Sequence, residues 1–129
     1  MKNKVALVCS NYYENITEGL INGAKDKLDP SFDVEVFLVD GAWELIYKIN
    51  QLSKNNSFDK FIAIGVIVKG DTDHYEYISK GVTDGLINLT IHNNIYIANC
   101  VLNVLNLKQA NERISDNKNK GSEAATALN

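Results

Sequence analysis

The sequence predicts an α/β protein in which helices cover both faces of an open parallel sheet. Apolar residues occur in four short, almost continuous runs, which is typical of strands buried on both faces of such a sheet. Segments with apolar residues at helical spacing separate the runs, so strands and helices alternate along the chain. Right-handed crossovers between units of this kind give a doubly wound sheet. The predicted strands are residues 5–9, 34–39, 61–68 and 95–101.

Three apolar stripes define the helices between these strands. The first helix is expected to end at Asp29-Pro30, because proline cannot continue a helix and restricts the residue before it. Near the C-terminus we expect a helix that ends at Glu112-Arg113, a polar loop over residues 118–122 and an alanine-rich helix over residues 123–128. The three stripes are Ile16, Leu20, Ile21, Ala24 and Leu28; Ala42, Leu45, Ile46, Ile49 and Leu52; and Tyr75, Ile78, Val82, Leu86 and Leu89.

Length and composition indicate a single globular domain over residues 1–129. The chain is 45% hydrophobic and 22% charged, and it is long enough to fold on an apolar core without a disulfide or a metal. A formal net charge of −3, without a basic stripe, makes nucleic acid an unexpected partner. The longest apolar run, residues 61–68, is far shorter than the roughly 20 residues that cross a membrane.

The N-terminal residues and the two cysteines indicate in which cellular compartment the protein is expected. Residues 1–7 pass from a short basic start directly into a predicted strand, without the apolar segment of an export signal. Cys9 and Cys100 lack the spacing of a metal or redox motif, and we expect them to stay reduced and packed. The sequence therefore predicts a cytoplasmic protein.

Residues 69–77 follow the third predicted strand, at the edge where doubly wound sheets bind their ligands. A glycine turn meets a helix start here, with Asp73 and Glu76 spaced as in a capping box, and such a turn can bind phosphate. His74 lies in the first turn, where the helix dipole favours neutral imidazole and a role in proton transfer. The alternatives are a plain helix cap and a solvated histidine.

Aromatic residues follow the first two strands at the same edge of the sheet. Trp43, the only tryptophan, and Glu44 open the second helix, while Tyr12 and Tyr13 follow the first strand. Rings beside a carboxylate can bind a planar heterocycle that carries hydroxyl groups, although Trp43 could equally cap the core. On spacing alone, four further side chains are expected to be solvated at the surface: His92, in a polar turn, and Arg113, Lys120 and Glu123.

Five sequence blocks follow one another along nearly the whole chain. The longest is GVIVKGDTDHYEY at residues 65–77, and the others are NIT with GA (15–17 and 23–24), GAWE (41–44), QANER (109–113) and NKGSEAA (119–125). Together they resemble the 6,7-dimethyl-8-ribityllumazine synthase family of riboflavin biosynthesis, whose long segment is of the GxxxKGxTxHxE type. The resemblance implies a flavodoxin-like three-layer α/β/α sandwich with a parallel, mainly four-stranded sheet.

The resemblance also implies a transferase activity. The family joins 5-amino-6-(D-ribitylamino)uracil to 3,4-dihydroxy-2-butanone 4-phosphate, releases phosphate and water, and uses no metal or organic cofactor. His74 is similar to the family's proton-transfer histidine, and Arg113 would pair with the phosphate. Gly70, Asp71 and Thr72 would cradle that phosphate. The implied contacts to the pyrimidine and the ribityl chain come from Tyr12, Ala42, Trp43, Glu44, Val66, Ile67, Val68 and Asn99.

The implied assembly is a homo-oligomer, because the family's active sites lie between the subunits of a pentamer. Arg113, Lys120 and Glu123 would then serve the pocket of a neighbouring subunit. A decamer or a sixty-subunit shell is the alternative to an isolated pentamer, and riboflavin synthase is a further expected partner.

Three departures from the family pattern keep other functions open. Asn99 stands where an aromatic residue is usual, Asp71 stands where many relatives carry a small neutral residue, and the stretch 114–119 is one residue shorter. The alternatives are a non-catalytic flavin- or lumazine-binding relative and a shell-forming relative. A signalling receiver domain does not fit, because Lys69-Gly70 follows the third strand where a phosphoacceptor aspartate would be needed.

Overall fold

The computed structural model describes residues 3–55 and 58–129. Met1 and Lys2, at the start of the N-terminal segment considered above, lie outside these ranges. Strands and helices alternate as predicted until two helices follow one another at the C-terminus. The elements are β1 (Asn3–Ser10), α1 (Glu14–Lys27), β2 (Phe32–Val39), α2 (Glu44–Asn55), β3 (Lys60–Val68), α3 (His74–Asn93), β4 (Tyr96–Val104), α4 (Leu107–Glu112) and α5 (Lys120–Leu128).

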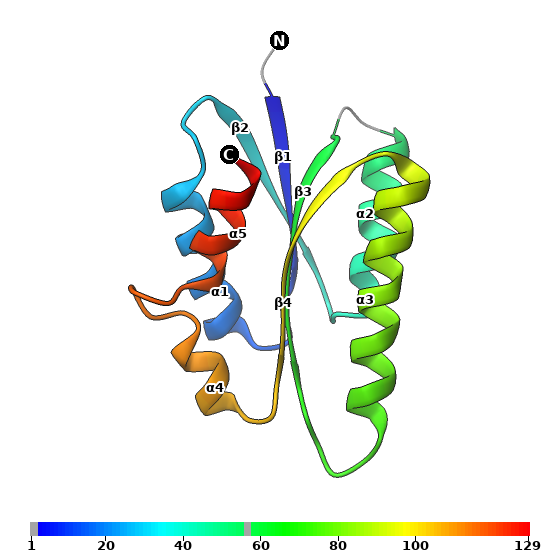
Figure 1. Ribbon diagram of the computed structural model, residues 1–129, viewed down its shortest axis with the longest axis vertical. Helices are drawn as coiled ribbons and strands as arrows, with labels where there is room; N and C mark the ends of the chain where they lie inside the picture. Colours follow the sequence, from blue (N-terminus) through cyan, green and yellow to red (C-terminus); the bar gives the residue numbers. More distant parts are fainter. Residues whose placement is uncertain (1–2, 56–57) are drawn as a thin grey trace.

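The strands form a parallel sheet in the order β2-β1-β3-β4. Helices α1, α4 and α5 cover one face of the sheet, and α2 and α3 cover the other (Figure 1). The predicted three-layer α/β/α sandwich is therefore confirmed. The chain leaves β1 toward β2 and then crosses to the opposite side for β3, so the topological switch point lies between β1 and β3. Ligands of such sheets bind at the carboxyl ends of the strands beside this point.

Two apolar cores hold the strands beside the switch point in place. Successive side chains of a strand point to opposite faces of the sheet. Val5, Leu7 and Cys9 of β1 therefore belong to the core with α1 and α5, whereas Ala6 and Val8 belong to the core with α2 and α3. All five side chains are fully buried, which fixes the carboxyl end of β1 from both sides.

β2 differs from the prediction because it is not buried on both faces. It lies at the edge of the sheet and pairs only with β1. Val36 is 37% exposed and Leu38 is 56% exposed. A continuous apolar run therefore indicated a strand correctly here, but it did not distinguish an edge strand from a central one.

Two helix boundaries also differ from the prediction. α5 begins at Lys120 and not at 123, because the side chain of Asn119 accepts a hydrogen bond of 3.1 Å from the N–H of Ser122 and caps the helix earlier. α3 continues to Asn93, so the exposed His92 belongs to its last turn and not to a polar loop. Asn94 caps the end of the helix, and its φ of 51° lies in the left-handed region that asparagine tolerates.

Candidate active site

A cleft of about 530 Å³ opens at the carboxyl ends of the strands beside the switch point. We call it the aromatic cleft, because two tyrosines and the tryptophan contribute to its wall. It brings together nearly all the residues that the sequence assigned to heterocycle binding. Its lining residues are Tyr12, Tyr13, Gly41, Ala42, Trp43, Glu44, Val66, Ile67, Val68, His74 and Ile78.

Hydrogen bonds beneath the tyrosines fix the segment that carries them. The N–H of Asn11 donates to the carbonyl oxygen of Val39 at 2.8 Å, which ties the end of β1 to the end of β2. The buried hydroxyl of Thr17 donates to the carbonyl oxygen of Ser10 at 2.7 Å, which ties α1 to the same point. Tyr12 therefore projects from an anchored turn, and its ring packs edge-on against Tyr13 with 4.9 Å between the ring centroids.

The aromatic rings are largely open to solvent. The side chain of Tyr12 is 73% exposed and that of Trp43 is 62% exposed. Trp43 occupies the turn between β2 and α2, and the N–H of Glu44 donates to the carbonyl oxygen of Gly41 at 3.2 Å within it. Aromatic faces left exposed beside a cleft are suited to stacking on a planar ligand. The alternative in which Trp43 merely caps the core does not agree with this exposure.

Main-chain groups of β3 face the aromatic cleft without a strand partner. β1 pairs with β3 only as far as Cys9 and Ile64, whereas the pairing of β3 with β4 continues to Val68 and Val104. On the β1 side, every second residue of 65–68 therefore carries an N–H and a C=O group that no described strand uses. Main-chain N–H and C=O groups need a hydrogen-bond partner, and a ligand in the cleft can supply one.

His74 is the first residue of α3 and is exposed at the cleft. Its N–H donates to the hydroxyl of Thr72 at 3.3 Å. The predicted capping box is wrong, because Asp73 makes no side-chain cap and Glu76 instead pairs with Lys69 at 3.2 Å. The pKa of Glu76 is lowered, first by a hydrogen bond from its own main-chain N–H and then by Lys69.

The loop between β3 and α3 lies fully at the surface beside His74. Gly70, Asp71 and Thr72 are all exposed, and they do not line the aromatic cleft. A Cβ atom added at Gly70 would meet no atom within 4 Å, so the space above the turn is open. The loop can therefore receive a group that reaches it from the cleft, at the N-terminal end of a 20-residue helix.

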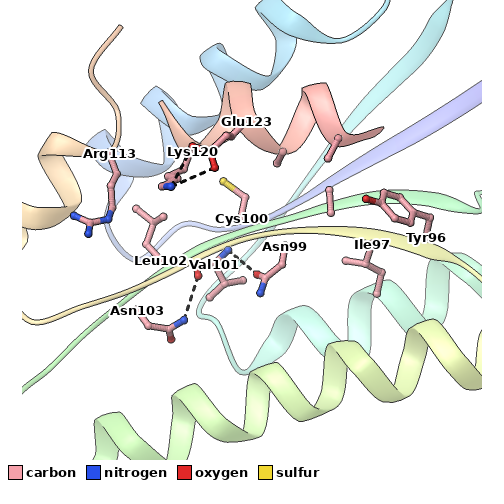
Figure 2. Close-up of a pocket in the computed structure, with 13 residues that line it drawn as sticks. Tyr96, Ile97, Asn99, Cys100, Val101, Leu102, Asn103, Arg113, Lys120 and Glu123 are labelled. Atoms are coloured by element: carbon pink, nitrogen blue, oxygen red, sulfur yellow. Dashed lines mark hydrogen bonds and ion pairs between the residues drawn. The ribbon is translucent and has the colours of Figure 1, made fainter. Parts of the chain in front are cut away.

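A second pocket, of about 400 Å³, lies along β4 at the other edge of the sheet. We call it the β4-edge pocket. Figure 2 shows Arg113, Lys120 and Glu123 on one side of β4, with Asn99 and Asn103 on the other. Lys120 and Glu123 form an ion pair of 3.1 Å, and the guanidinium of Arg113 donates to the carbonyl oxygen of Gln109 at 2.7 Å.

Within one chain, the structure separates Asn99 and Arg113 from the assigned residues of the aromatic cleft; for Arg113, the resemblance had already implied a place in the pocket of a neighbouring subunit. His74 lines the aromatic cleft, whereas Arg113 and Asn99 line the β4-edge pocket, and the two pockets share no residue. The carbonyl oxygen of the Asn99 side chain accepts a bond of 2.9 Å from the N–H of Val101. Asn103 lines the same pocket and was not predicted. The sequence did offer a signal for Asn103, because Asn99 and Asn103 lie four residues apart on one face of an apolar strand.

The two cysteines are free and buried, as predicted. Burial raises the pKa of each thiol from 9.0 to about 12. Both therefore remain neutral near pH 7 and are poor nucleophiles. In residues 3–55 and 58–129, no cluster of His, Cys, Asp or Glu side chains is arranged to hold a metal ion. No helix in the same ranges has the length and hydropathy needed to cross a membrane.

Comparison with known proteins places this geometry in a family. The family model for 6,7-dimethyl-8-ribityllumazine synthase matches residues 2–129. Proteins with that name include one from Buchnera aphidicola (subsp. Baizongia pistaciae), 38% identical over 98% of this chain and 84% of its own length. Another, from Flavobacterium johnsoniae, is 34% identical over 96% of this chain and 68% of its own length. A third, from Campylobacter jejuni, is 32% identical over 97% of this chain and 84% of its own length. The chain belongs to the 6,7-dimethyl-8-ribityllumazine synthase family.

Proposed function

We propose that the protein is a 6,7-dimethyl-8-ribityllumazine synthase, a transferase of riboflavin biosynthesis. It would condense 5-amino-6-(D-ribitylamino)uracil with 3,4-dihydroxy-2-butanone 4-phosphate. The observation that carries the proposal is the aromatic cleft, in which exposed rings, unpaired strand backbone and His74 converge at the switch point. Family membership over nearly the whole chain identifies the substrates that such a cleft would receive.

The pyrimidine substrate fits the aromatic cleft by its chemistry. The face of the ring would stack on Tyr12, while Ala42 and Trp43 would enclose the ring and the ribityl chain. The carboxylate of Glu44 accepts hydrogen bonds and suits the ribityl hydroxyls. The ring edge carries amide-like donors and acceptors, which would pair with those main-chain groups of Val66–Val68 that face the cleft and not β4. These assignments use the groups that the fold leaves unpaired.

The phosphate substrate would bind where the aromatic cleft meets the loop before α3. Gly70, Asp71 and Thr72 would contact its phosphate at the positive end of the helix dipole. Two phosphate oxygens match the planar donors of an arginine, which is the role proposed for Arg113. The carboxylate of Asp71 would repel the anion, so a guanidinium partner is all the more needed.

His74 would transfer protons in each step of the reaction. The amine of the pyrimidine attacks the ketone, and loss of water forms an imine. Phosphate then leaves by elimination, and ring closure releases a second water. Each step moves a proton near the phosphate, and an exposed imidazole at the start of α3 can both accept and donate one. Holding the two substrates together would supply much of the remaining acceleration.

The site would be completed between subunits of a homo-oligomer. One chain presents His74 and Arg113 in different pockets, so a neighbour's β4-edge pocket would have to meet the aromatic cleft. Lys120 and Glu123 would support Arg113 in that pocket. Large apolar side chains on the outer surface of α3 suit burial in such an assembly: Tyr77 is 73%, Ile87 52% and Ile91 67% exposed. A pentamer is the proposed unit; a larger shell, association with riboflavin synthase and a cytoplasmic location stay predictions.

A turnover assay tests the proposal. The purified protein is mixed with both substrates, and the absorbance and green fluorescence of the lumazine are followed against the spontaneous reaction. We expect product formation well above that background, in proportion to protein concentration. No excess over the background would refute the enzyme activity. Binding of riboflavin without turnover would favour the non-catalytic carrier, to which the polar Asn99 in the β4-edge pocket gives some support.

A further inference from the structure

We propose that Gly81 of α3 is a positioning residue for the indole of Trp43. The absence of a side chain at position 81 lets the indole lie against the helix and sets its orientation at the wall of the aromatic cleft. The inference rests on the proposed function, because it assigns Gly81 an effect on binding of the pyrimidine substrate. Its contact with Trp43 can nevertheless be tested without turnover.

The contact between the two residues is close. A Cβ atom built at Gly81 would lie 3.2 Å from Cζ3 of Trp43 and 3.9 Å from Cη2. The first distance is tighter than ordinary van der Waals contact between carbons. A methyl group at position 81 is attached to helix backbone and cannot give way. The indole, which is 62% exposed, is free to move outward, so it and not the helix would shift.

The position of the indole matters for two cavities at once. Trp43 and Glu44 line the aromatic cleft, and they also line an apolar cavity of about 460 Å³ between α2 and α3. Gly81 lines this second cavity and does not line the aromatic cleft. A change at Gly81 can therefore affect the aromatic cleft through the indole ring, which lines both spaces.

Glycine at this position is not explained by helix formation. Gly81 lies in the interior of the 20-residue α3, where glycine is a much poorer helix former than alanine. The packing against Trp43 gives a physical reason for it. Gly85, one turn further along, lines the same cavity and provides a matched comparison, because the three atoms nearest to a Cβ built there all belong to Ile46, with Cδ1 at 2.8 Å.

The test compares Gly81→Ala with Gly85→Ala in the full chain. Trp43 is the only tryptophan, so the intrinsic tryptophan fluorescence reports on this one side chain. We expect Gly81→Ala to change the emission maximum and to increase quenching by acrylamide, while Gly85→Ala changes neither. We also expect Gly81→Ala to raise KM for the pyrimidine about three- to tenfold, the range of a lost aromatic contact, with kcat unchanged.

A double-mutant cycle separates positioning from a general effect on folding. In a Trp43→Ala background, Gly81→Ala should change KM less than twofold, because its target is absent. Unchanged fluorescence and KM in Gly81→Ala, or equal effects of Gly85→Ala, would overturn the inference. If the wild-type protein has no turnover, the proposed function fails, and the quenching comparison alone then decides whether Gly81 positions Trp43.

Discussion

The N–H of Lys120 donates a hydrogen bond of 2.9 Å to the carbonyl oxygen of Arg113. This bond closes the 113–120 segment on itself and holds two cationic residues of the β4-edge pocket in one unit. Asn119 anchors the unit to α1, because its side-chain amide donates to the carbonyl oxygens of Gly19 at 3.1 Å and Ile114 at 3.2 Å. The geometry of the pocket therefore depends on a residue that does not line it.

We expect Asn119→Ala to destabilise the protein by about 2 to 3 kcal/mol, since it removes a helix cap and the hydrogen bonds that Asn119 donates to the carbonyl oxygens of Gly19 and Ile114. Urea denaturation measures the loss. Asn106 offers a matched control, because it caps α4 through an exposed bond of 2.9 Å from the N–H of Gln109 and makes no bond to α1. Asn106→Ala should cost only about 1 kcal/mol. Equal losses for the two variants would show that the anchor to α1 contributes nothing.

His74→Ala should lower kcat by about 100-fold, the lower end of the range for general acid–base catalysis, because substrate positioning remains. KM for both substrates should change little. His92, exposed in the last turn of the same helix, is the control. His92→Ala should retain wild-type kcat, and a fall in kcat as large as that of His74→Ala would argue against a specific role for His74.

Arg113→Ala should raise KM for the butanone phosphate about 10- to 100-fold and leave KM for the pyrimidine unchanged, since a hydrogen bond to a charged group is lost. Arg113→Lys should raise KM for the butanone phosphate less than Arg113→Ala does, because an ammonium keeps the charge but not the planar pair of donors. Lys118 lies in the same segment, is exposed and does not line the pocket, so Lys118→Ala is the control. Steady-state kinetics with each substrate varied in turn would measure the effect. An unchanged KM for the phosphate in Arg113→Ala would remove Arg113 from the site.

Stability should fall as the pH rises above about 9, the ordinary pKa of a thiol, toward 12. In that interval the unfolded chain loses the protons of Cys9 and Cys100, while burial keeps both thiols protonated in the folded chain. The unfolded state then binds fewer protons, so the free energy of unfolding decreases with pH. Urea midpoints at pH 8 and pH 10.5 should show a smaller decrease for the Cys9→Ala, Cys100→Ala double variant. Equal decreases would contradict the contribution of the cysteines.

The arrangement of layers could be predicted from sequence because apolar runs and helical stripes report directly on burial. The same patterns did not reveal that Leu38 is exposed, since strand order is a long-range property. They also did not reveal the start of α5 at Lys120, because the cap at Asn119 depends on packing against α1. Contacts between segments far apart in the sequence decided both cases.

The candidate site was predictable as a set of residues and not as an arrangement. Tyr12, Trp43 and His74 follow three different strands, and the parallel topology brings their ends together. Arg113 belongs to a segment that the fold places beside β4, in the β4-edge pocket and away from the aromatic cleft. Motif order along the chain carries no information about this separation. Gly81 was missed because a glycine within a helix gives no local signal of what packs against it.

A complementation assay tests most directly whether the chain is a lumazine synthase whose site is shared between subunits. His74→Ala and Arg113→Ala are produced together in equal amounts. The turnover of the mixed oligomers is compared with that of each variant alone, at a butanone phosphate concentration well below the wild-type KM, where both single variants are slow. Random mixing should restore about a quarter of wild-type turnover, because some neighbouring pairs then combine an intact His74 with an intact Arg113. Turnover no higher than the mean of the two single variants would contradict a shared site.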